Sequence, residues 1–507
     1  MRTRRSAIAM AAALLLVVTS VGVASAAPMT KVANREATAA TDPAADCILP
    51  AGGSEGAIDF DWHIRPAGTI RGVMLFVDFP DVPAAGSAET LFEDLFFPMA
   101  DQWMRLSSND RVSLDVTPLR HWLRMPEPLS AYPLTATGSL ATDVGRRYIA
   151  QAIALADPEV DFSQYSVVYI VPNEEAGAFR RSSAWSSNPG SGVLADGIKV
   201  RFAVTFGTRV YTTGYTTLDH ETSHFFGLPD LYASDAPTDR FVAIWDIMGD
   251  SRVANDHIAW SKWRVGWLDD DQIACVNEAS EGDHTIWSLA WTGGTKAVVL
   301  RTGLQTAIVA EYRTMETLDR DICSAGVLIY KVDSTLKTRQ GPVQVVDANP
   351  ATVTGSGACQ DQLDDAAFAV GSSWVDPETG ISIQVSATQD AGAVDLHVVR
   401  PETYDAPVRY ARSLSMRAKV NAAGTTTVTG TLTVSKKFVS CRAGRKVSLQ
   451  QLRAGAWVTI RTAVTKATGS WAYTWTPEPG TYRLKAIDTW TSTWYCLPAT
   501  SKSVTLP

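Results

Sequence analysis

The sequence LDHETSHFFGLPDLY, from Leu218 to Tyr232, contains the pattern HExxH at its centre. On a helix, His220 and His224 would lie one turn apart on the same face, where both imidazoles can bind one metal ion. Zinc is the metal that this pattern ordinarily holds. The segment therefore predicts a helix that carries two zinc ligands, whereas the alternative is an amphipathic helix with incidental histidines.

A third ligand is expected from the residues that follow the helix. Gly227 allows the helix to end in a left-handed turn, and Pro229 prevents its continuation. Asp230 comes ten residues after His220, where long-motif zinc peptidases place their third ligand. Two nitrogens and one oxygen are an ordinary zinc set. An Asp in a Pro-Asp turn can instead cap the turn or bind calcium.

Two further residues fit the chemistry of such a site. Glu221 stands beside the first histidine, and its carboxylate can accept a proton from water activated by the metal and pass it to a leaving amine. Met248, eighteen residues after Asp230 in IWDIMGD, is expected in a tight turn beneath the metal. Ordinary core packing is the alternative for this methionine.

Several blocks in order resemble one family, immune inhibitor A, a group of secreted bacterial zinc metallopeptidases related to the metzincins. The resemblance covers roughly residues 58 to 399. It is carried by VMLFVDFPD at Val73, the zinc motif with its trailing GLPDLY, WDIMGD, AWSKWRVGWL at Ala259, and AEYRTMETLDRDICSAGVLIYKVD at Ala310.

The resemblance implies a zinc-dependent endopeptidase that acts on proteins or peptides, often with structural calcium. It also implies an α+β metzincin-like catalytic domain, assigned to residues 58–283. Calcium could bind the acidic segment after the zinc motif, or this segment could be a solvated loop. Its carboxylates are Asp235, Asp239, Asp246 and Asp250.

The group that would stabilise the oxyanion is left open. Many metzincins place Tyr two residues after the turn methionine, but Asp250 stands there. Tyr232 and His257 are candidates, and each could be purely structural. Glu311 and Arg313 alternate on a predicted strand, which favours a buried ion pair over catalysis.

The pattern of the chain changes after about residue 283. Short runs such as KAVVLRTG, AIVAEYR and GVLIYKVD predict a β-rich subdomain over 284–400, packed on the catalytic domain. Regularly spaced short strands then predict an all-β, Ig-like sandwich over 405–507.

Charge separates these regions. The chain has a net charge of −8. Residues 401–507 contain 15 Lys and Arg against four Asp and Glu, or +11, and the residues before them total −19. We therefore expect the sandwich to bind anionic cell-wall or polysaccharide surfaces through a salt-sensitive contact, with a passive spacer as the alternative. No nucleic-acid partner is expected.

The N-terminus predicts export. Residues 1–26 combine three arginines, an apolar stretch and an AxA site, as a signal peptide does. The general secretory route is favoured over the twin-arginine route. Residues 27–57 are rich in Ala, Thr, Pro and Gly and predict a linker or a short pro-segment. No later segment is apolar enough to span a bilayer, so a secreted, extracellular protein is expected.

Six cysteines in an oxidising compartment predict three disulfides. The domain boundaries favour Cys441 with Cys496 and Cys323 with Cys359, which leaves Cys47 with Cys275. One alternative is that the thiolate of Cys47, in a removable pro-segment, occupies the open position of the metal.

Two functions from other classes compete with proteolysis. One is a non-catalytic secreted binding protein on a peptidase scaffold, against which the intact His220, Glu221 and His224 argue. The other is a zinc hydrolase that acts on a non-peptide bond, because the activated water would be the same.

Overall fold

The computed structural model describes residues 43–50, 52–133, 142–177, 179–352, 359, 361–421, 425–453 and 455–506. The expected signal peptide at 1–26 and the first part of the expected linker, 27–42, lie outside these ranges. The described chain is mixed α/β and mostly β. No helix in these ranges is both long and apolar enough to cross a membrane.

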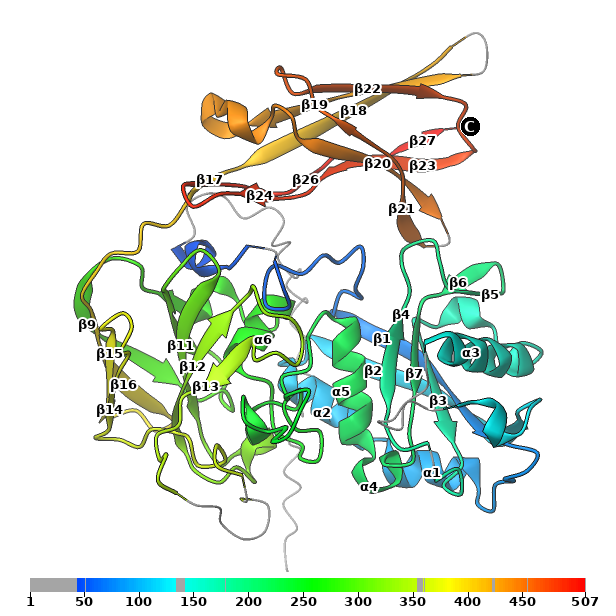
Figure 1. Cartoon of the computed structure of the whole chain (residues 1–507), viewed down its shortest axis with the longest axis horizontal. Coiled ribbons are helices and arrows are strands. Elements are labelled where there is room, and N and C mark those ends of the chain that lie inside the picture. Colours follow the sequence, from blue (N-terminus) through cyan, green and yellow to red (C-terminus); the bar gives the residue numbers. More distant parts are fainter. Residues whose placement is uncertain are drawn as a thin grey trace, which may run out of the picture. The chain divides into compact units, whose positions relative to one another are not determined.

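The first sheet supports the predicted metal-binding helix (Figure 1). Its strands, in spatial order, are β2 (Val112–Arg124), β1 (Gly68–Asp78), β3 (Val167–Pro172), β7 (Phe202–Thr205) and β4 (Ser183–Ser186). Four strands are parallel, and β4 pairs antiparallel with β7 at one edge. The alternating side chains of β1 enter two cores, Met74 on one face and Leu75 on the other. Burial on both faces explains the continuous apolar run VMLFVDF.

Helices cover both faces of this sheet. One face packs against α3 (Thr142–Ala156), and the other against α1 (Ala88–Leu95), α2 (Met99–Ser107), α4 (Val210–Thr213) and α5 (Tyr215–Phe225). The remaining helix, α6 (Ala259–Val265), lies beside β11 (Thr306–Arg313) and β12 (Gly326–Asp333) (Figure 1). A small hairpin of β5 (Val193–Ala195) and β6 (Ile198–Val200) lies near α3. Helices α1 and α2 are separated at Pro98, because proline has no backbone N–H to continue a helix.

Residues 273–400 form two further sheets. One has the order β13 (Val343–Val345), β12 (Gly326–Asp333), β11 (Thr306–Arg313), β10 (Ala297–Arg301) and β8 (Ile273–Cys275). The other has the order β14 (Ser373–Val375), β15 (Ser382–Ala387), β16 (Ala393–Arg400) and β9 (Ser280–Trp287). Val299 of β10 joins the core shared with α5 and α6, while Val298 faces the second of these sheets. The β-rich residues therefore share one core with the helices.

The predicted ion pair of β11 is present in this shared core. Arg313 lies 3.0 Å from Glu311 and 2.6 Å from Asp319, and all three side chains are buried. Removing one partner would leave a buried charge without compensation, so this pair supports the sheet.

The last hundred residues form β strands around a core of their own. One sheet has β18 (Arg412–Val420), β19 (Thr426–Val434) and β22 (Ser470–Trp475), and another has β21 (Ala456–Val464), β20 (Lys446–Arg453), β23 (Gly480–Ala486) and β26 (Ala499–Thr500), with β27 (Val504–Leu506) also on β23. A third, small sheet contains β17 (Val408–Tyr410), β25 (Trp494–Cys496) and β24 (Thr489–Trp490). The apolar side chains of β19, β20 and β23 meet between the larger sheets.

The three predicted disulfide pairs are confirmed. They are Cys47–Cys275, Cys323–Cys359 and Cys441–Cys496. The alternative of a metal-blocking Cys47 thiolate is therefore wrong for this structure, because its sulfur is bonded to Cys275.

The described part of residues 43–57 is packed against the body of the protein. A 3₁₀ helix (Pro43–Cys47) leads to the disulfide, and Glu55 forms a buried ion pair with Arg264 of α6, 2.8 Å apart. These contacts connect residues more than 200 positions apart. The sequence composition alone indicated only a linker or pro-segment here.

Candidate metal centre

Helix α5 begins and ends at glycines that the backbone requires. Gly214 has a φ of 55° at the N-terminus, and a Cβ there would lie 2.5 Å from the Leu95 carbonyl oxygen. Gly227 has a φ of 97°, and a Cβ there would meet Ile58 at 2.9 Å. Only glycine tolerates a positive φ together with so close a neighbour. The helix therefore ends before Gly227, and the chain turns back toward the last turn of α5.

The two histidines and the predicted third ligand converge. His220 Nε2 lies 3.3 Å and His224 Nε2 3.1 Å from Asp230 Oδ1. Within the described residues, these three form the only group of at least three His, Cys, Asp or Glu side chains with spacing suited to one metal ion. The side chain of His224 is 21% exposed and that of Asp230 16%, so the group opens to solvent.

Hydrogen bonds fix the orientation of both rings. His220 Nδ1 lies 2.8 Å from the Ile247 carbonyl oxygen, and His224 Nδ1 lies 2.8 Å from that of Leu228. A carbonyl only accepts, so each Nδ1 donates and each Nε2 is left for a metal or a second proton. The backbone thus presents the metal-binding nitrogen of each ring to Asp230.

The donor set fits a zinc ion. Asp230 Oδ1 is buried and has no well-aligned hydrogen-bond donor, although both Nε2 atoms are close to it. A single cation would satisfy this oxygen and both nitrogens together. Two imidazole nitrogens and one carboxylate oxygen leave a fourth position open, as in catalytic zinc sites.

The electrostatics of His220, His224 and Asp230 favour a positive charge in the space between these three side chains. Burial on its own lowers the pKa of His224, but Asp230 outweighs burial and raises that pKa to about 9. Burial on its own raises the pKa of Asp230, but the two imidazoles hold it far below its ordinary value. The three side chains therefore attract either protons or a metal cation, and the two compete.

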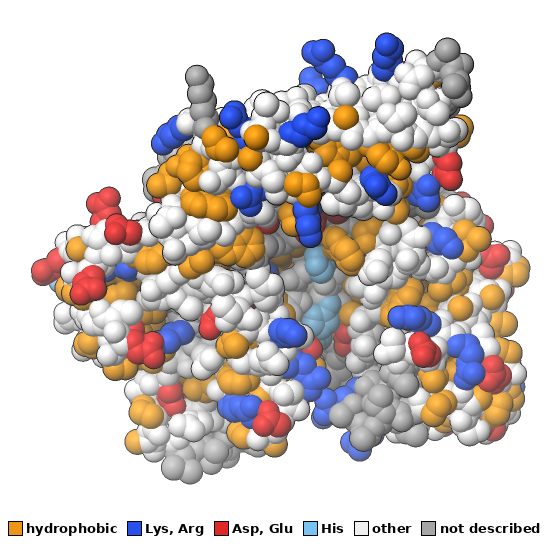
Figure 2. Space-filling model, turned by 45° about the horizontal axis from the view of Figure 1, so that its top comes forward, with side chains coloured by type: hydrophobic (Ala, Val, Ile, Leu, Met, Phe, Trp, Pro, Cys, Tyr) orange, Lys and Arg blue, Asp and Glu red, His pale blue; other side chains and the backbone are white. Residues whose placement is uncertain are grey.

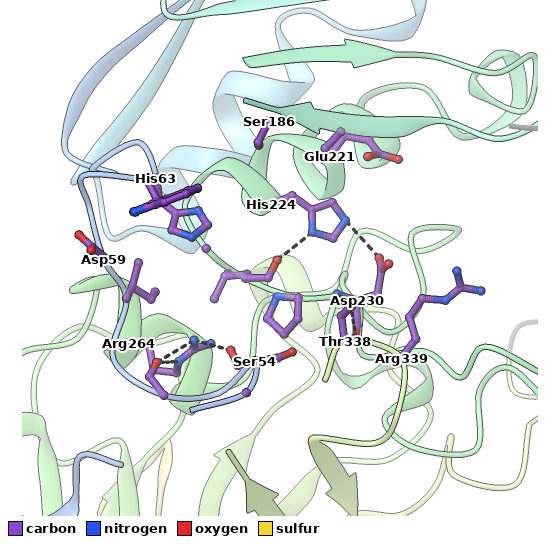
Figure 3. A pocket seen from close by; sticks show the side chains of 18 of the residues that line it. Ser54, Asp59, His63, Ser186, Glu221, His224, Asp230, Arg264, Thr338 and Arg339 are labelled. Atoms are coloured by element: carbon purple, nitrogen blue, oxygen red, sulfur yellow. Dashed lines mark hydrogen bonds and ion pairs between the residues drawn. The ribbon is translucent and has the colours of Figure 1, made fainter. Parts of the chain in front are cut away.

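Glu221, the predicted general base, is buried beside the two histidines. Burial raises its pKa above the ordinary value, although His220 and His224 oppose the rise. Its carboxylate lines the same pocket as His224 and Asp230 (Figure 3). A carboxylate whose pKa is raised toward neutral pH can both accept a proton and return it.

The predicted methionine turn lies against the ligands, but mainly through its backbone. Met248 is fully buried, and its carbonyl accepts from the Leu231 N–H at 2.9 Å. The carbonyl of Ile247 accepts from His220. Gly249 closes the turn, where a Cβ would lie 2.5 Å from the Ala243 carbonyl oxygen. The backbone of this turn therefore positions His220 and Leu231, the residue after Asp230.

The two residues considered for oxyanion binding lie in different environments. Tyr232 lines the pocket, and its ring stacks on His220 with 6.3 Å between centroids. His257 is fully buried, contacts Ser223 and Asp246, and packs edge-on against Trp103. Only Tyr232 is placed where it could meet a substrate.

The carboxylates of the acidic segment after the zinc motif each have a different neighbour. Asp235 pairs with Arg240, and Asp250 with Arg252. Asp246 is buried against His257. Burial and the neighbouring Asp239 raise the pKa of Asp361 to about 6. The calcium expected in this segment remains a prediction.

A pocket of about 680 Å³ is lined by two of the three predicted ligands, His224 and Asp230, and by Glu221. It is lined by residues 52–63, by β4, by the end of α5 with Gly227 to Tyr232, and by Thr338 and Arg339. Figure 2 shows histidine side chains inside a hollow with Lys and Arg around it. His63, Arg181 and Arg339 were not anticipated from the sequence, because nothing near them in the chain marks them as neighbours of the motif.

No protein-family model matches this chain, and no curated protein matches it. The resemblance to the immune inhibitor A family therefore stays a prediction that rests on the motif residues.

Proposed function

We propose that this chain is a zinc-dependent endopeptidase that hydrolyses peptide bonds in extracellular proteins. The observation that carries the proposal is the convergence of His220, His224 and Asp230 beside Glu221. Incidental histidines would have no reason to place both Nε2 atoms on one carboxylate oxygen, with each Nδ1 held by a backbone carbonyl.

The residues of the site divide the reaction among them. His220, His224 and Asp230 would hold the zinc ion, which supplies Lewis-acid activation of water and of the substrate carbonyl. Glu221 accepts the proton of the attacking water and delivers it to the amine that leaves. Tyr232, beside His220 in the pocket, is in a position to donate to the developing oxyanion.

The edge strand β4 favours a peptide over other substrates. Ser183, Ala184 and Ser186 line the pocket, and among the described strands β4 pairs only with β7. A free edge offers backbone donors and acceptors to an extended chain. A peptide paired with β4 would pass the metal ligands, whereas a compact non-peptide substrate would not use this edge.

The same proposal covers the family of the catalytic half, the fold of the C-terminal domain and the export of the protein. The catalytic half would be a metzincin-like domain of the immune inhibitor A family, followed by an Ig-like sandwich. Export is supported by the signal-like residues 1–26 and by the three disulfides, which persist in oxidising compartments.

The test is cleavage of a denatured casein-like protein by the purified chain, with and without a zinc chelator. Cleavage should stop with the chelator and return with added zinc, and mass spectrometry should find internal cut sites. Glu221→Gln, treated in the same way, excludes a contaminating protease. A chain that holds zinc but cuts no protein would favour the non-catalytic binding protein.

A further inference from the structure

The charged side chains that line the pocket do not balance. Apart from the metal ligands and Glu221, they are Asp59, Arg181, Arg264 and Arg339. Asp59 pairs with Lys485 at 2.7 Å, and Arg264 with Glu55 at 2.8 Å. Arg181 and Arg339 form no ion pair with any described residue. Both guanidinium groups therefore line the pocket without an ion-pair partner among the described residues.

The backbone ties Arg339 to the metal site. It belongs to the loop between β12 and β13, where its N–H donates to the Asp230 carbonyl at 3.0 Å. The Asp230 N–H donates in turn to Thr338 Oγ1 at 3.0 Å. Arg339 has a φ of 65°, which costs a non-glycine residue free energy and persists only where the surroundings enforce it. Figure 3 shows Arg339, Thr338 and Asp230 on one side of the pocket, away from His63.

The side chain of Arg339 is held close to the ligands but is not satisfied. Its guanidinium lies over the Tyr232 ring, 5.0 Å from the centroid, and that ring stacks on His220. Its Nε is buried and has no hydrogen-bond partner. A buried donor without a partner is unfavourable, so the protein alone does not satisfy the hydrogen-bonding capacity of this guanidinium.

We propose that Arg339 binds a carboxylate of the substrate and that the enzyme prefers peptides with Asp or Glu next to the cleaved bond. This inference rests on the proposed function, because it names the substrate class of the same site. A guanidinium pairs with a carboxylate through two parallel, charge-assisted hydrogen bonds. Arg181, two residues before β4, adds attraction for a second acidic residue along the same peptide.

The proposed role belongs to the side chain of Arg339 and differs from a purely structural role of its backbone. If only its backbone mattered, the side chain could be changed without effect on substrate choice. The same chemistry could be supplied by an acidic side chain or by the carboxylate at the end of a chain. The experiment must therefore compare both sources.

The test is binding by zinc-loaded full-length protein in a Glu221→Gln background, where no peptide is cut. Short fluorescent peptides with Glu, or Gln at the same positions, are compared by anisotropy, each as a C-terminal amide and as a free acid. We expect the Glu peptide to bind about tenfold or more tightly. Arg339→Gln should remove most of this preference and leave only the part due to Arg181, and Arg339→Glu should reverse it toward a Lys peptide.

Arg146→Gln, at an exposed position of α3, is the matched control and should keep the preference. Arg339→Lys should keep part of it, because the charge remains and the forked geometry is lost. Preference for the free acid alone would assign Arg339 to a chain terminus. Equal binding of Glu and Gln peptides, or an unchanged preference in Arg339→Gln, overturns the inference. Absence of proteolysis by wild-type protein overturns the proposed function and leaves this binding result intact.

Discussion

Asp246 Oδ1 lies 2.8 Å from His257 Nδ1, and neither side chain has any exposed surface. The same carboxylate accepts hydrogen bonds from the backbone N–H groups of Met248 and Ile258, at 2.8 and 2.9 Å. His257 also reaches Ser223, the residue before the second histidine of the motif. Asp246 therefore connects the methionine turn to helix α5 through His257, and these contacts occupy its carboxylate.

Replacing Asp246 should destabilise the whole fold. Asp246→Ala leaves His257 and two backbone donors buried without their acceptor, so the free energy of unfolding should fall by about 3–5 kcal/mol. Urea unfolding followed by fluorescence measures the change. Asp235→Ala, which breaks an exposed pair with Arg240, should cost less than about 1 kcal/mol. Equal effects of the two substitutions would contradict a structural role for Asp246.

The contribution of Asp246 should disappear in acid. Burial on its own raises its pKa, but His257 and the backbone donors outweigh burial and lower it. A carboxylate with a lowered pKa stabilises the fold fully above its unfolded pKa, ~3.9, and loses this contribution as pH falls through the folded value. The stability difference between wild type and Asp246→Asn should therefore be constant near neutrality and shrink below about pH 4. A difference that grows in acid would show the opposite sign of shift.

Glu221→Gln should separate metal binding from turnover. The ligands His220, His224 and Asp230 are unchanged, so zinc should remain at one ion per chain. Turnover should fall by roughly 10²- to 10⁴-fold, the usual contribution of a general base. Elemental analysis and peptide hydrolysis on the same sample decide the matter, with Glu175→Gln at an exposed position as the control. Undiminished hydrolysis by folded Glu221→Gln would remove Glu221 from the mechanism.

Asp230→Ala should release the metal. The site would keep two neutral imidazoles and lose its anionic ligand, so zinc affinity should fall more than about 100-fold, beyond the roughly 10- to 100-fold loss seen for an outer-shell partner. Competition with a fluorescent zinc chelator measures the affinity, and Asp235→Ala serves as the control. Full zinc occupancy with intact activity would mean that the third ligand lies elsewhere.

The C-terminal sandwich should bind acidic polymers in a salt-sensitive way. Lys485 and Arg483 already pair with Asp59 and Asp61, so the binding charge must come from elsewhere, such as the cluster at Arg442, Arg445 and Lys446. A 405–507 fragment should sediment with cell walls at low salt and be released at high salt. The same fragment with all three cluster residues changed to Gln is the control. A folded fragment that stays in the supernatant at low salt would make the domain a spacer.

The tryptophans of this domain bear on the same question. Trp471 is buried, whereas Trp457, Trp475, Trp490 and Trp494 are half-buried. Stacking on a glycan needs an exposed ring face, so Trp471 is excluded as a stacking ring, whereas the four half-buried rings stay candidates.

The sequence by itself determined the local part of the site. Helix geometry places residues four apart on one face, so His220 and His224 could be paired without a structure. Gly227 and Pro229 indicated where the helix ends and hence that Asp230 could return to it. Domain boundaries were enough to pair the six cysteines, because each of two proposed regions held a single pair.

Only the tertiary structure decided which distant residues surround that site. Arg339 reaches Asp230 from a loop 109 positions away, and residues 52–63 line the pocket because Glu55 is buried against Arg264. His257 and Tyr232 were equal candidates until packing buried one and exposed the other to the pocket. The physical reason is that periodicity and turn residues act within a few positions, whereas contacts across the chain depend on how whole sheets and helices pack around a shared core.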